Sequence, residues 1–167
     1  GLRAVCLRYF NASGASERFG EDHEPETHLI PKLLRVAAGR EPEATLFGDD
    51  YPTRDGTCVR DYIHILDLAH AHLLAIESTE AGSARYNLGC GGDGYSNREV
   101  LDSVRRVTGR EVPARIGPRR PGDPAALVAS SARIHGALGW APKHQDLDAI
   151  VSSAWSWHQR FPEGYPR

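Results

Sequence analysis

The segment Cys58-Val59-Arg60-Asp61-Tyr62-Ile63-His64-Ile65 gives the clearest indication of the fold. Its apolar part, Tyr62–Ile65, has the length and the residue types of a short β-strand. Directly behind it, Leu68–Glu77 carries apolar side chains at helical spacing. A strand that leads straight into a helix is typical of α/β domains, so this segment favours that class.

The same alternation of strand and helix extends in both directions. Leu2–Phe10 is predicted as a strand, buried on both faces if it lies in a parallel sheet, and it stops at the turn-forming residues Asn11–Gly14. Ser96 and Glu99 have the spacing of a capping box, which predicts a helix that runs to Gly109. The other expected strands are Thr45–Phe47, Arg85–Leu88 and Val112–Gly117, and the other expected helices are Leu29–Gly39 and Asp146–Phe161, the last with Ile150, Ala154, Trp157 and Phe161 on one stripe.

Composition excludes two classes of partner. The 167 residues include 20 basic and 22 acidic side chains, for a formal charge of −2. Without a basic excess we expect no binding of nucleic acid, and without a long uncharged apolar run we expect no membrane span. At this length a single core of normal size can form, so one domain is the first expectation.

The start of the chain and its cysteines indicate a longer parent protein in the cytoplasm. The sequence lacks methionine, and Gly1 leads directly into the apolar run Leu2–Phe10, whereas natural N-termini are usually looser and more polar. Cys6, Cys58 and Cys90 are odd in number and unclustered, which suits a reducing compartment better than a disulfide framework or a metal site.

The segment Arg119-Arg120-Pro121-Gly122-Asp123 combines side chains that suit a nucleoside diphosphate. A guanidinium group offers a planar fork of donors to phosphate oxygens, and a nearby carboxylate can accept hydrogen bonds from ribose hydroxyls. The alternative is a solvated turn with a surface ion pair worth less than about 1 kcal/mol. Taken alone, the segment favours the solvated turn.

Two neighbouring charges, Arg60 and Asp61, stand at the entry to the strand Tyr62–Ile65. Neighbours along a strand face opposite sides, so at least one of the two must point into the protein or into a site. A salt bridge within the protein is an equal alternative to a ligand contact.

Two further patterns resemble binding motifs without meeting their requirements. Gly89–Gly94 spells G-x-G-x-x-G after a strand, but the helix begins only beyond Gly94 and no carboxylate ends the next strand, so a tight glycine turn is favoured over a dinucleotide fingerprint. His64, His70 and His72 have no cysteine or carboxylate at the spacing of metal ligands. We therefore predict hydrogen-bonded histidines on a helix surface, and no metal site.

Three stretches together resemble the UDP-glucose 4-epimerase family: Leu7–Asn11, Phe47–His64 and Arg119–Asp123, in that order. The glycine turn after Tyr86-Asn87-Leu88 and the segment Leu138-Gly139-Trp140 fit as well, so the likeness covers nearly the whole chain. The family belongs to the extended short-chain dehydrogenases, which pair an NAD-binding Rossmann domain with a smaller domain for the nucleotide sugar. The chain is similar to the C-terminal half of such an enzyme.

The resemblance implies an α/β substrate-binding part with the last strands of a Rossmann domain whose N-terminal part is absent. Residues 1–12 would be a late Rossmann strand and its turn, and residues 13–167 a UDP-sugar-binding domain that returns elements to the Rossmann sheet. In the family, NAD takes a hydride from C4 of the sugar while a tyrosine takes the proton of the 4-hydroxyl. Return of the hydride to the other face interconverts UDP-glucose and UDP-galactose.

The resemblance also assigns roles to the residues that match the motifs. Phe10 matches the residue beside the nicotinamide of NAD, and Asn11 the amide that contacts the phosphate or the sugar. His28 and Leu29 match a substrate-contacting pair that many relatives begin with Asn.

Nearer the nucleotide, Thr45 and Phe47 match positions whose backbone meets the uracil. Arg60 and Arg120 match arginines on the pyrophosphate, and Asp123 matches the carboxylate on the uridine ribose. These matches favour the ligand contact over the salt bridge or solvated turn.

Leu127 stands where some relatives place a tyrosine that excludes N-acetyl sugars, so we expect the intact enzyme to tolerate them.

The catalytic residues of the family are not in this sequence. The family uses Tyr-x-x-x-Lys, in which the lysine lowers the pKa of the tyrosine, but the only lysines, Lys32 and Lys143, follow His28 and Gly139 at that spacing. We therefore expect the chain alone to be inactive and the intact enzyme to be an NAD-dependent homodimer. The alternatives are an epimerase for UDP-N-acetylglucosamine, UDP-arabinose or UDP-glucuronate, or a non-catalytic module that binds nucleotide sugars.

Overall fold

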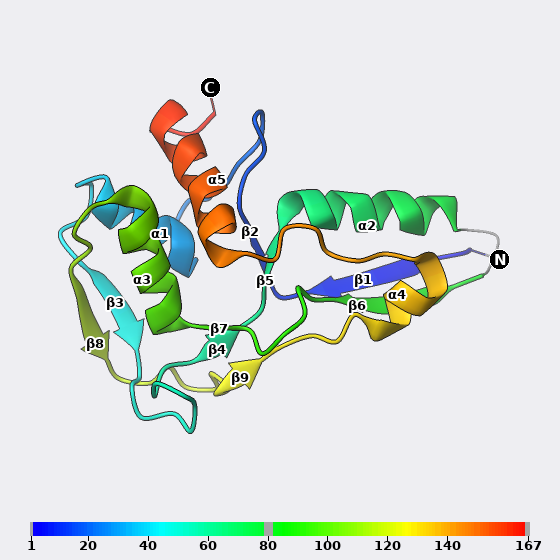
Figure 1. Ribbon diagram of the computed structural model, residues 1–167, viewed down its shortest axis with the longest axis horizontal. Helices are drawn as coiled ribbons and strands as arrows, with labels where there is room; N and C mark the ends of the chain where they lie inside the picture. The colour runs from blue at the N-terminus through cyan, green and yellow to red at the C-terminus, as the bar shows by residue number, and fades with distance from the viewer. Residues whose placement is uncertain (1, 79–81, 166–167) are drawn as a thin grey trace.

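The computed structural model describes residues 2–78 and 82–165, which form an elongated α/β structure (Figure 1). The α/β class predicted from the sequence is confirmed. The helices are α1 (Leu29–Ala37), α2 (Ile65–Glu77), α3 (Asn97–Thr108), α4 (Ala132–Leu138) and α5 (Leu147–Arg160). The strands are β1 (Val5–Tyr9), β2 (Asn11–Ser13), β3 (Ala44–Phe47), β4 (Val59–Arg60), β5 (Tyr62–His64), β6 (Ala84–Leu88), β7 (Tyr95–Ser96), β8 (Ala114–Gly117) and β9 (Ala126–Leu127).

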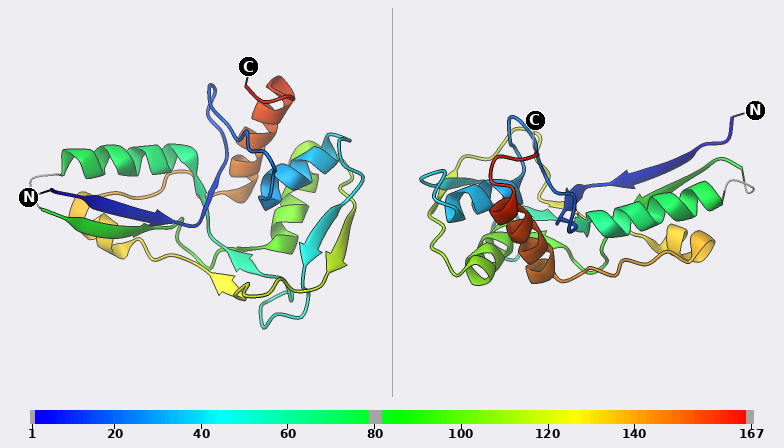
Figure 2. Two further views of the ribbon diagram at one scale, coloured as in Figure 1. Left: turned by 180° about the vertical axis from the view of Figure 1, so that it is seen from behind. Right: turned by 90° about the horizontal axis from the view of Figure 1, so that it is seen from above.

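Within the described residues, the strands pair in four small sheets. Three sheets are parallel pairs: β1 with β6, β2 with β5, and β3 with β8. In the fourth, β4 lies between β7, which is antiparallel to it, and β9, which is parallel. Helix α2 connects β5 to β6, which belong to different sheets, and it packs along the side of the β1–β6 pair (Figure 2).

One end of the molecule, which we call the helical end, consists of α1, α3 and α5 with β3 and β8 (Figure 1). Its core is continuous: Leu33 and Leu34 of α1, Val100 and Val104 of α3, and Ile150 of α5 are all fully buried. The predicted stripe on α5 is largely confirmed, since Ile150, Ala154 and Trp157 are buried and only Phe161, which follows the helix, is partly exposed. This end holds the elements that surround the candidate site.

The other end, which we call the β1–β6 end, consists of β1, β6, α2 and α4. Its core gathers around Trp140 and Ile134, which are fully buried. The parallel pairing of β1 is confirmed, but the expected burial of Leu2–Phe10 on both faces is wrong: Leu2 is 92% exposed and Phe10 47%. The reason is that β1 pairs with β6 alone among the described strands, so much of its surface is uncovered.

Residues 59–64 form one of the segments that join the two ends. Tyr62 and Ile63 are neighbours on β5, and because strand side chains alternate, Tyr62 enters the core of the helical end while Ile63 enters the core of the β1–β6 end. Asp61 is 3% exposed, and its two carboxylate oxygens accept hydrogen bonds from the amides of Cys90 (2.9 Å) and Ala129 (3.0 Å). Asp61 therefore points into the protein, and Arg60 faces the other way.

The glycine segment 89–94 is a tight turn, as predicted. Gly91, Gly92 and Gly94 have positive φ angles, and the segment leads into β7 rather than into a helix. A Cβ on Gly89 would lie 2.5 Å from the carboxylate of Asp61. The amide of Cys90 donates to that carboxylate. In a dinucleotide fingerprint, the corresponding amides would be free to bind phosphate.

The predicted capping box is present: Ser96 accepts from the amide of Glu99 (3.1 Å) and Glu99 accepts from the amide of Ser96 (2.7 Å).

The prediction of hydrogen-bonded histidines on a helix surface is confirmed for His72 and wrong in part for His64 and His70. His72 is exposed on α2, and its Nδ1 lies 2.7 Å from the carbonyl of Leu68. His64 is 3% exposed and caps α2 by accepting from the amide of Leu66 (3.1 Å). His70 was expected to be hydrogen-bonded, yet its buried Nδ1 has no partner among the described residues.

No helix in the described parts of the chain has both the length and the apolar character required to cross a bilayer.

Candidate functional site

A cavity of about 490 Å³ lies at the helical end, between β3, the start of α1, β4 and the segment before β9. Its volume is in the range of small-molecule sites. Every substrate-binding residue predicted from the sequence lines it except Leu127; these are Asn11, His28, Leu29, Thr45, Phe47, Arg60, Arg120 and Asp123. Residues up to 112 positions apart in the chain are thus brought to one cavity, from Asn11 to Asp123 (123 − 11 = 112).

Arg60 and Asp123 form an ion pair on one wall of the cavity, with Nη2 of Arg60 2.5 Å from Oδ1 of Asp123. The guanidinium also donates from Nη1 to the carbonyls of Val59 (2.8 Å) and Pro124 (2.9 Å), so its position is fixed by three acceptors. The side chain of Arg60 is only 11% exposed and that of Asp123 29%. The pair is therefore preformed, with the carboxylate the more accessible member.

The two adjacent arginines, Arg119 and Arg120, have different surroundings. The guanidinium of Arg120 lies over the ring of Phe47, 3.9 Å from its centroid, and lines the cavity. Arg119 stacks on Tyr51 at 4.2 Å and pairs with Asp50 at 2.6 Å, and this hydrogen bond lowers the pKa of the Asp50 carboxyl. The ion pair expected of a surface turn thus belongs to Arg119, which leaves Arg120 to the cavity.

Asn11 and His28 are held by neighbouring groups at the opening of the cavity. The side-chain amide of Asn11 donates to the carbonyl of Asp61 (2.9 Å), which ties β2 to β5. His28 precedes α1, and its amide and its Nδ1 both meet Oε1 of the buried Glu26, at 2.6 Å and 2.9 Å. Both side chains are therefore oriented before any ligand binds.

Phe10 and Leu127 lie outside the lining of the cavity. Phe10 follows β1 at the carboxyl end of the parallel β1–β6 pair and is 47% exposed. Leu127 lies on β9 directly beside Arg60 on β4, and its carbonyl accepts the amide of Asp61 at 3.1 Å. The position of Leu127 is thus tied to that of Arg60 although its side chain does not line this cavity.

Sequence reasoning missed six polar residues that line the cavity: Thr27, Lys32, Glu41, Glu43, Tyr62 and Asn97. Lys32 lies one helical turn after His28, so helical spacing alone places it on the same side of α1. Nothing in the local pattern around Asn97 distinguishes it from an ordinary residue in the first turn of a helix.

The protonation states within and near the cavity suit binding rather than proton transfer. Burial raises the pKa of the Tyr62 hydroxyl above its ordinary value, so this tyrosine stays protonated near neutral pH. Burial also raises the pKa of the Cys90 thiol to about 12, which removes it as a nucleophile. The charged groups that line the cavity include the guanidinium groups of Arg60 and Arg120 and the carboxylate of Asp123, which can hold a diphosphate and a pair of sugar hydroxyls. Lys32, Glu41 and Glu43 are the other charged residues of the lining.

Comparison with known proteins agrees with this arrangement. The UDP-glucose 4-epimerase of Lacticaseibacillus casei is 52% identical over 169 residues, covering 99% of this chain and 51% of its own length. A crystal structure of a UDP-glucose 4-epimerase superimposes with a TM-score of 0.95 at 50% identity, covering 99% of this chain and 51% of its own. The chain thus spans about half the length of the relatives it matches.

A further solved structure and a family sequence model also match the chain. The UDP-glucose 4-epimerase of Bifidobacterium longum, solved in complex with NAD⁺ and UDP, matches with a TM-score of 0.90 at 41% identity, covering 96% of this chain and 49% of its own. The sequence model of the NAD dependent epimerase/dehydratase family matches residues 1–89, which is more than half of the chain. The chain belongs to the NAD dependent epimerase/dehydratase family.

Proposed function

We propose that this chain is the nucleotide-sugar-binding half of a UDP-glucose 4-epimerase that interconverts UDP-glucose and UDP-galactose. The observation that carries the proposal is the single cavity that collects Arg60, Arg120 and Asp123 beside Phe47. The matched relatives, which bear that name, support the choice of substrate.

Each group in the cavity has a role in this proposal. Arg60 and Arg120 neutralise the diphosphate, and Asp123 accepts hydrogen bonds from the ribose hydroxyls. The backbone at Thr45 and Phe47 meets the uracil. Asn11, His28 and Leu29 contact the phosphate or the sugar, on the side of the cavity nearest to β2.

Phe10 is the residue of this chain that would contact NAD. It is half exposed at the carboxyl end of β1, and ligands of open parallel sheets bind beyond the carboxyl ends of the strands, so its place fits the nicotinamide. When bound, NAD supplies the hydride acceptor. The Gly89–Gly94 turn does not contribute to a phosphate site, because its first two amides already donate to Ser131 and Asp61.

Proton transfer is assigned to a Tyr-x-x-x-Lys pair that the sequence does not contain. We therefore expect the purified chain alone to show no interconversion of UDP-galactose and UDP-glucose, measured in a preparation free of host epimerase. Activity of the chain alone would overturn this part of the proposal. For the intact protein we propose a cytoplasmic homodimer with no nucleic-acid partner.

The binding role is tested by calorimetric titration of the purified chain with UDP, using the two adjacent arginines. Arg120→Ala is expected to lower the affinity at least tenfold, because a charge-assisted contact to phosphate is lost. Arg119→Ala removes an equal charge whose partners are Asp50 and Tyr51, and it should leave the affinity within about twofold. Equal losses in both variants would indicate a general charge effect and contradict the proposed site.

Leu127 decides between sugars in this proposal. Its side chain has intermediate volume and lies on β9 beside Arg60, which favours an enzyme that also accepts UDP-N-acetylglucosamine. In the intact enzyme, Leu127→Tyr should lower turnover of UDP-N-acetylglucosamine more than turnover of UDP-glucose. Equal turnover of UDP-N-acetylglucosamine by variant and parent would contradict the assignment. An intact protein that binds UDP without epimerising any UDP-sugar would support the non-catalytic module instead.

A further inference from the structure

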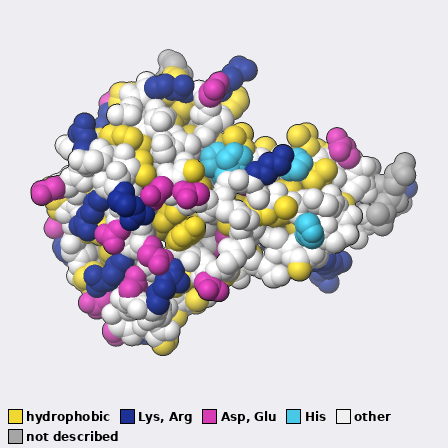
Figure 3. Space-filling view, viewed as in Figure 1, with side chains coloured by type: hydrophobic (Ala, Val, Ile, Leu, Met, Phe, Trp, Pro, Cys, Tyr) yellow, Lys and Arg dark blue, Asp and Glu magenta, His cyan; other side chains and the backbone are white. Residues whose placement is uncertain are grey.

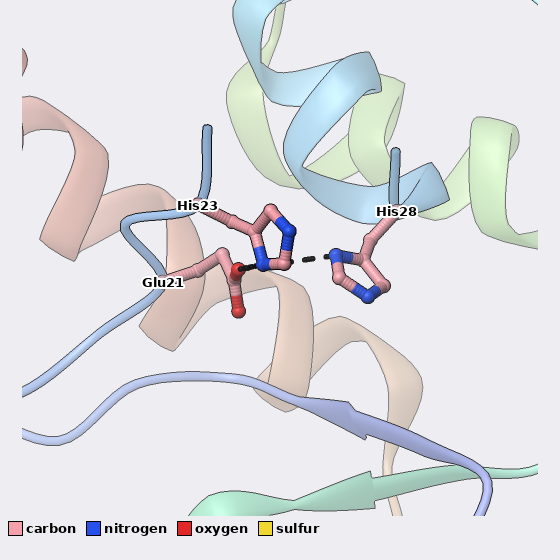
Figure 4. Close-up of side chains that lie close together, drawn as sticks. All are labelled: Glu21, His23 and His28. Carbon is pink, nitrogen blue, oxygen red and sulfur yellow. Dashed lines mark ion pairs between the residues drawn. The ribbon is translucent and has the colours of Figure 1, made fainter. Parts of the chain in front are cut away.

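The segment between β2 and α1 brings together three side chains that the proposed function does not use as a group: Glu21, His23 and His28 (Figure 4). One potential ligand atom from each lies within 4.8 Å of the other two. Oε1 of Glu21 is 3.7 Å from Nδ1 of His23 and 3.8 Å from Nδ1 of His28. The two imidazole rings are nearly perpendicular, at 82°, and each turns a nitrogen toward the carboxylate.

We propose that Glu21, His23 and His28 bind a divalent cation of the zinc class. Zinc takes imidazole nitrogens and carboxylate oxygens at about 2.0–2.2 Å in a tetrahedron, which places neighbouring ligand atoms roughly 3.3–3.6 Å apart. The two separations from Glu21 exceed that range by a few tenths of an ångström. The side chains of Glu21 and His23 are 37% and 51% exposed, so small rotations can close the difference.

Glu26 fixes the position of one of the three ligands. Its side chain is 2% exposed, and its Oε1 lies 2.9 Å from Nδ1 of His28. The same oxygen accepts the amide of His28 at 2.6 Å. Glu26 therefore orients His28 beside Glu21 and His23, as a carboxylate behind a metal-binding histidine does.

The ligand chemistry selects among cations. Two imidazoles with one carboxylate suit Zn²⁺, Co²⁺ or Ni²⁺, whereas Mg²⁺ and Ca²⁺ prefer sites made of oxygen alone. No sequence pattern indicates this site, because the spacings from Glu21 to His23 and from His23 to His28 match no standard motif. The site does not rest on the proposed function, since it can be tested with metal alone.

The test is calorimetric titration of the purified chain with Zn²⁺, together with Co²⁺ absorption spectra, at pH 7.5. We expect one ion per chain, and a loss of at least tenfold in affinity in His23→Gln, in His28→Gln and in Glu21→Gln. His135→Gln changes an exposed histidine at the β1–β6 end, and Cys6→Ser removes an exposed thiol; both should bind Zn²⁺ as the parent does. Circular dichroism of each variant verifies that it is folded.

Three results would overturn the proposal. The first is unchanged Zn²⁺ affinity in folded His23→Gln and His28→Gln. The second is loss of binding in Cys6→Ser or His135→Gln, which would place the ion elsewhere. The third is equal affinity for Mg²⁺ and Zn²⁺, which would indicate non-specific attraction to the carboxylates rather than ligation by imidazole.

Discussion

The helical end and the β1–β6 end bury their apolar side chains to different degrees. The core of the helical end is enclosed by three helices that pack on one another. At the β1–β6 end, Leu66, Leu73 and Ile76 of α2 are 43%, 59% and 68% exposed, and Tyr9 and Phe10 are about half exposed. In Figure 3, charged side chains gather over the helical end, and the arm opposite carries mainly hydrophobic and uncharged groups.

In the proposed function, this difference separates the part of the chain that binds the nucleotide sugar from the part that faces the catalytic residues. The helical end completes its own core and carries the cavity, so the arginines and the carboxylate are positioned without help from further protein. The β1–β6 end presents Phe10 and several exposed apolar side chains of α2, and large exposed apolar patches usually mark interaction surfaces. In the proposed function, that partner is the part of the enzyme that would hold NAD and the catalytic tyrosine.

The largest expected effect comes from the small core of the β1–β6 end. Trp140 is fully buried, and its indole nitrogen donates to the carbonyl of Asp67 at 3.1 Å. Trp140→Ala should lower the free energy of unfolding by about 3–5 kcal/mol, because it leaves a cavity and removes the hydrogen bond of the indole nitrogen. Leu73→Ala, at an exposed position of the same end, should change it by less than about 0.5 kcal/mol in the same urea titration. Similar losses in both would mean that this end has no specific core.

An intermediate effect is expected where the two ends meet. Asp61→Asn keeps the shape of the side chain but turns one acceptor oxygen into a donor that faces an amide of Cys90 or Ala129. The loss of a charged, buried hydrogen bond should destabilise the protein by about 1–3 kcal/mol. Asp93→Asn, on the exposed part of the neighbouring glycine turn, is the matched control and should have little effect. A stability change below about 0.5 kcal/mol in Asp61→Asn would show that the junction does not depend on this carboxylate.

A smaller effect is expected at the helical end, from the start of α3. Ser96→Ala removes the side-chain cap on the amide of Glu99 and a hydrogen bond to Asp55, and should cost about 1 kcal/mol. Ser156→Ala, on the exposed side of α5, should be close to neutral in the same measurement. If both serines prove neutral, the capping box contributes nothing to this helix.

The smallest effect concerns pH. Burial, with the nearby His144 imidazole as the second cause, lowers the pKa of His64, and burial likewise lowers the pKa of His158. An unfolded histidine has a pKa of about 6.5. When the pKa is lower in the folded state, the unfolded state takes up the proton more readily, so the folded protein loses stability as the pH falls through about 6.5. We therefore expect the free energy of unfolding to decrease between pH 7 and pH 5. His64→Gln should flatten this dependence and leave the share of His158; an unchanged slope would exclude His64 as its source.

Local patterns predicted most of the secondary structure. The capping box at Ser96, the helix expected over Leu29–Gly39 and the alternation at Arg60 and Asp61 are local signals, and the structure follows each of them. The site residues came from the family resemblance, because no local pattern shows that Asn11 and Asp123 share a cavity.

Features set by packing between distant segments could not be predicted in this way. The exposure of β1 depends on how many strands pair with it, and the burial of His64 depends on Ser153 of α5, 89 positions away in the chain, which lies 3.2 Å from its Nε2. The convergence of His23 and His28 on Glu21 depends on the path of an irregular segment, which has no periodicity to analyse.

Because β5 contributes side chains to both cores, it couples the cavity to the β1–β6 end. Tyr62 and Ile63 are consecutive residues anchored in different cores, and Arg60 lies only two residues before Tyr62, about 7 Å along an extended chain. A displacement of either core would therefore move the backbone of Arg60, which lines the cavity. Substitutions at the β1–β6 end can thus change the position of Arg60 without touching any residue of the cavity lining.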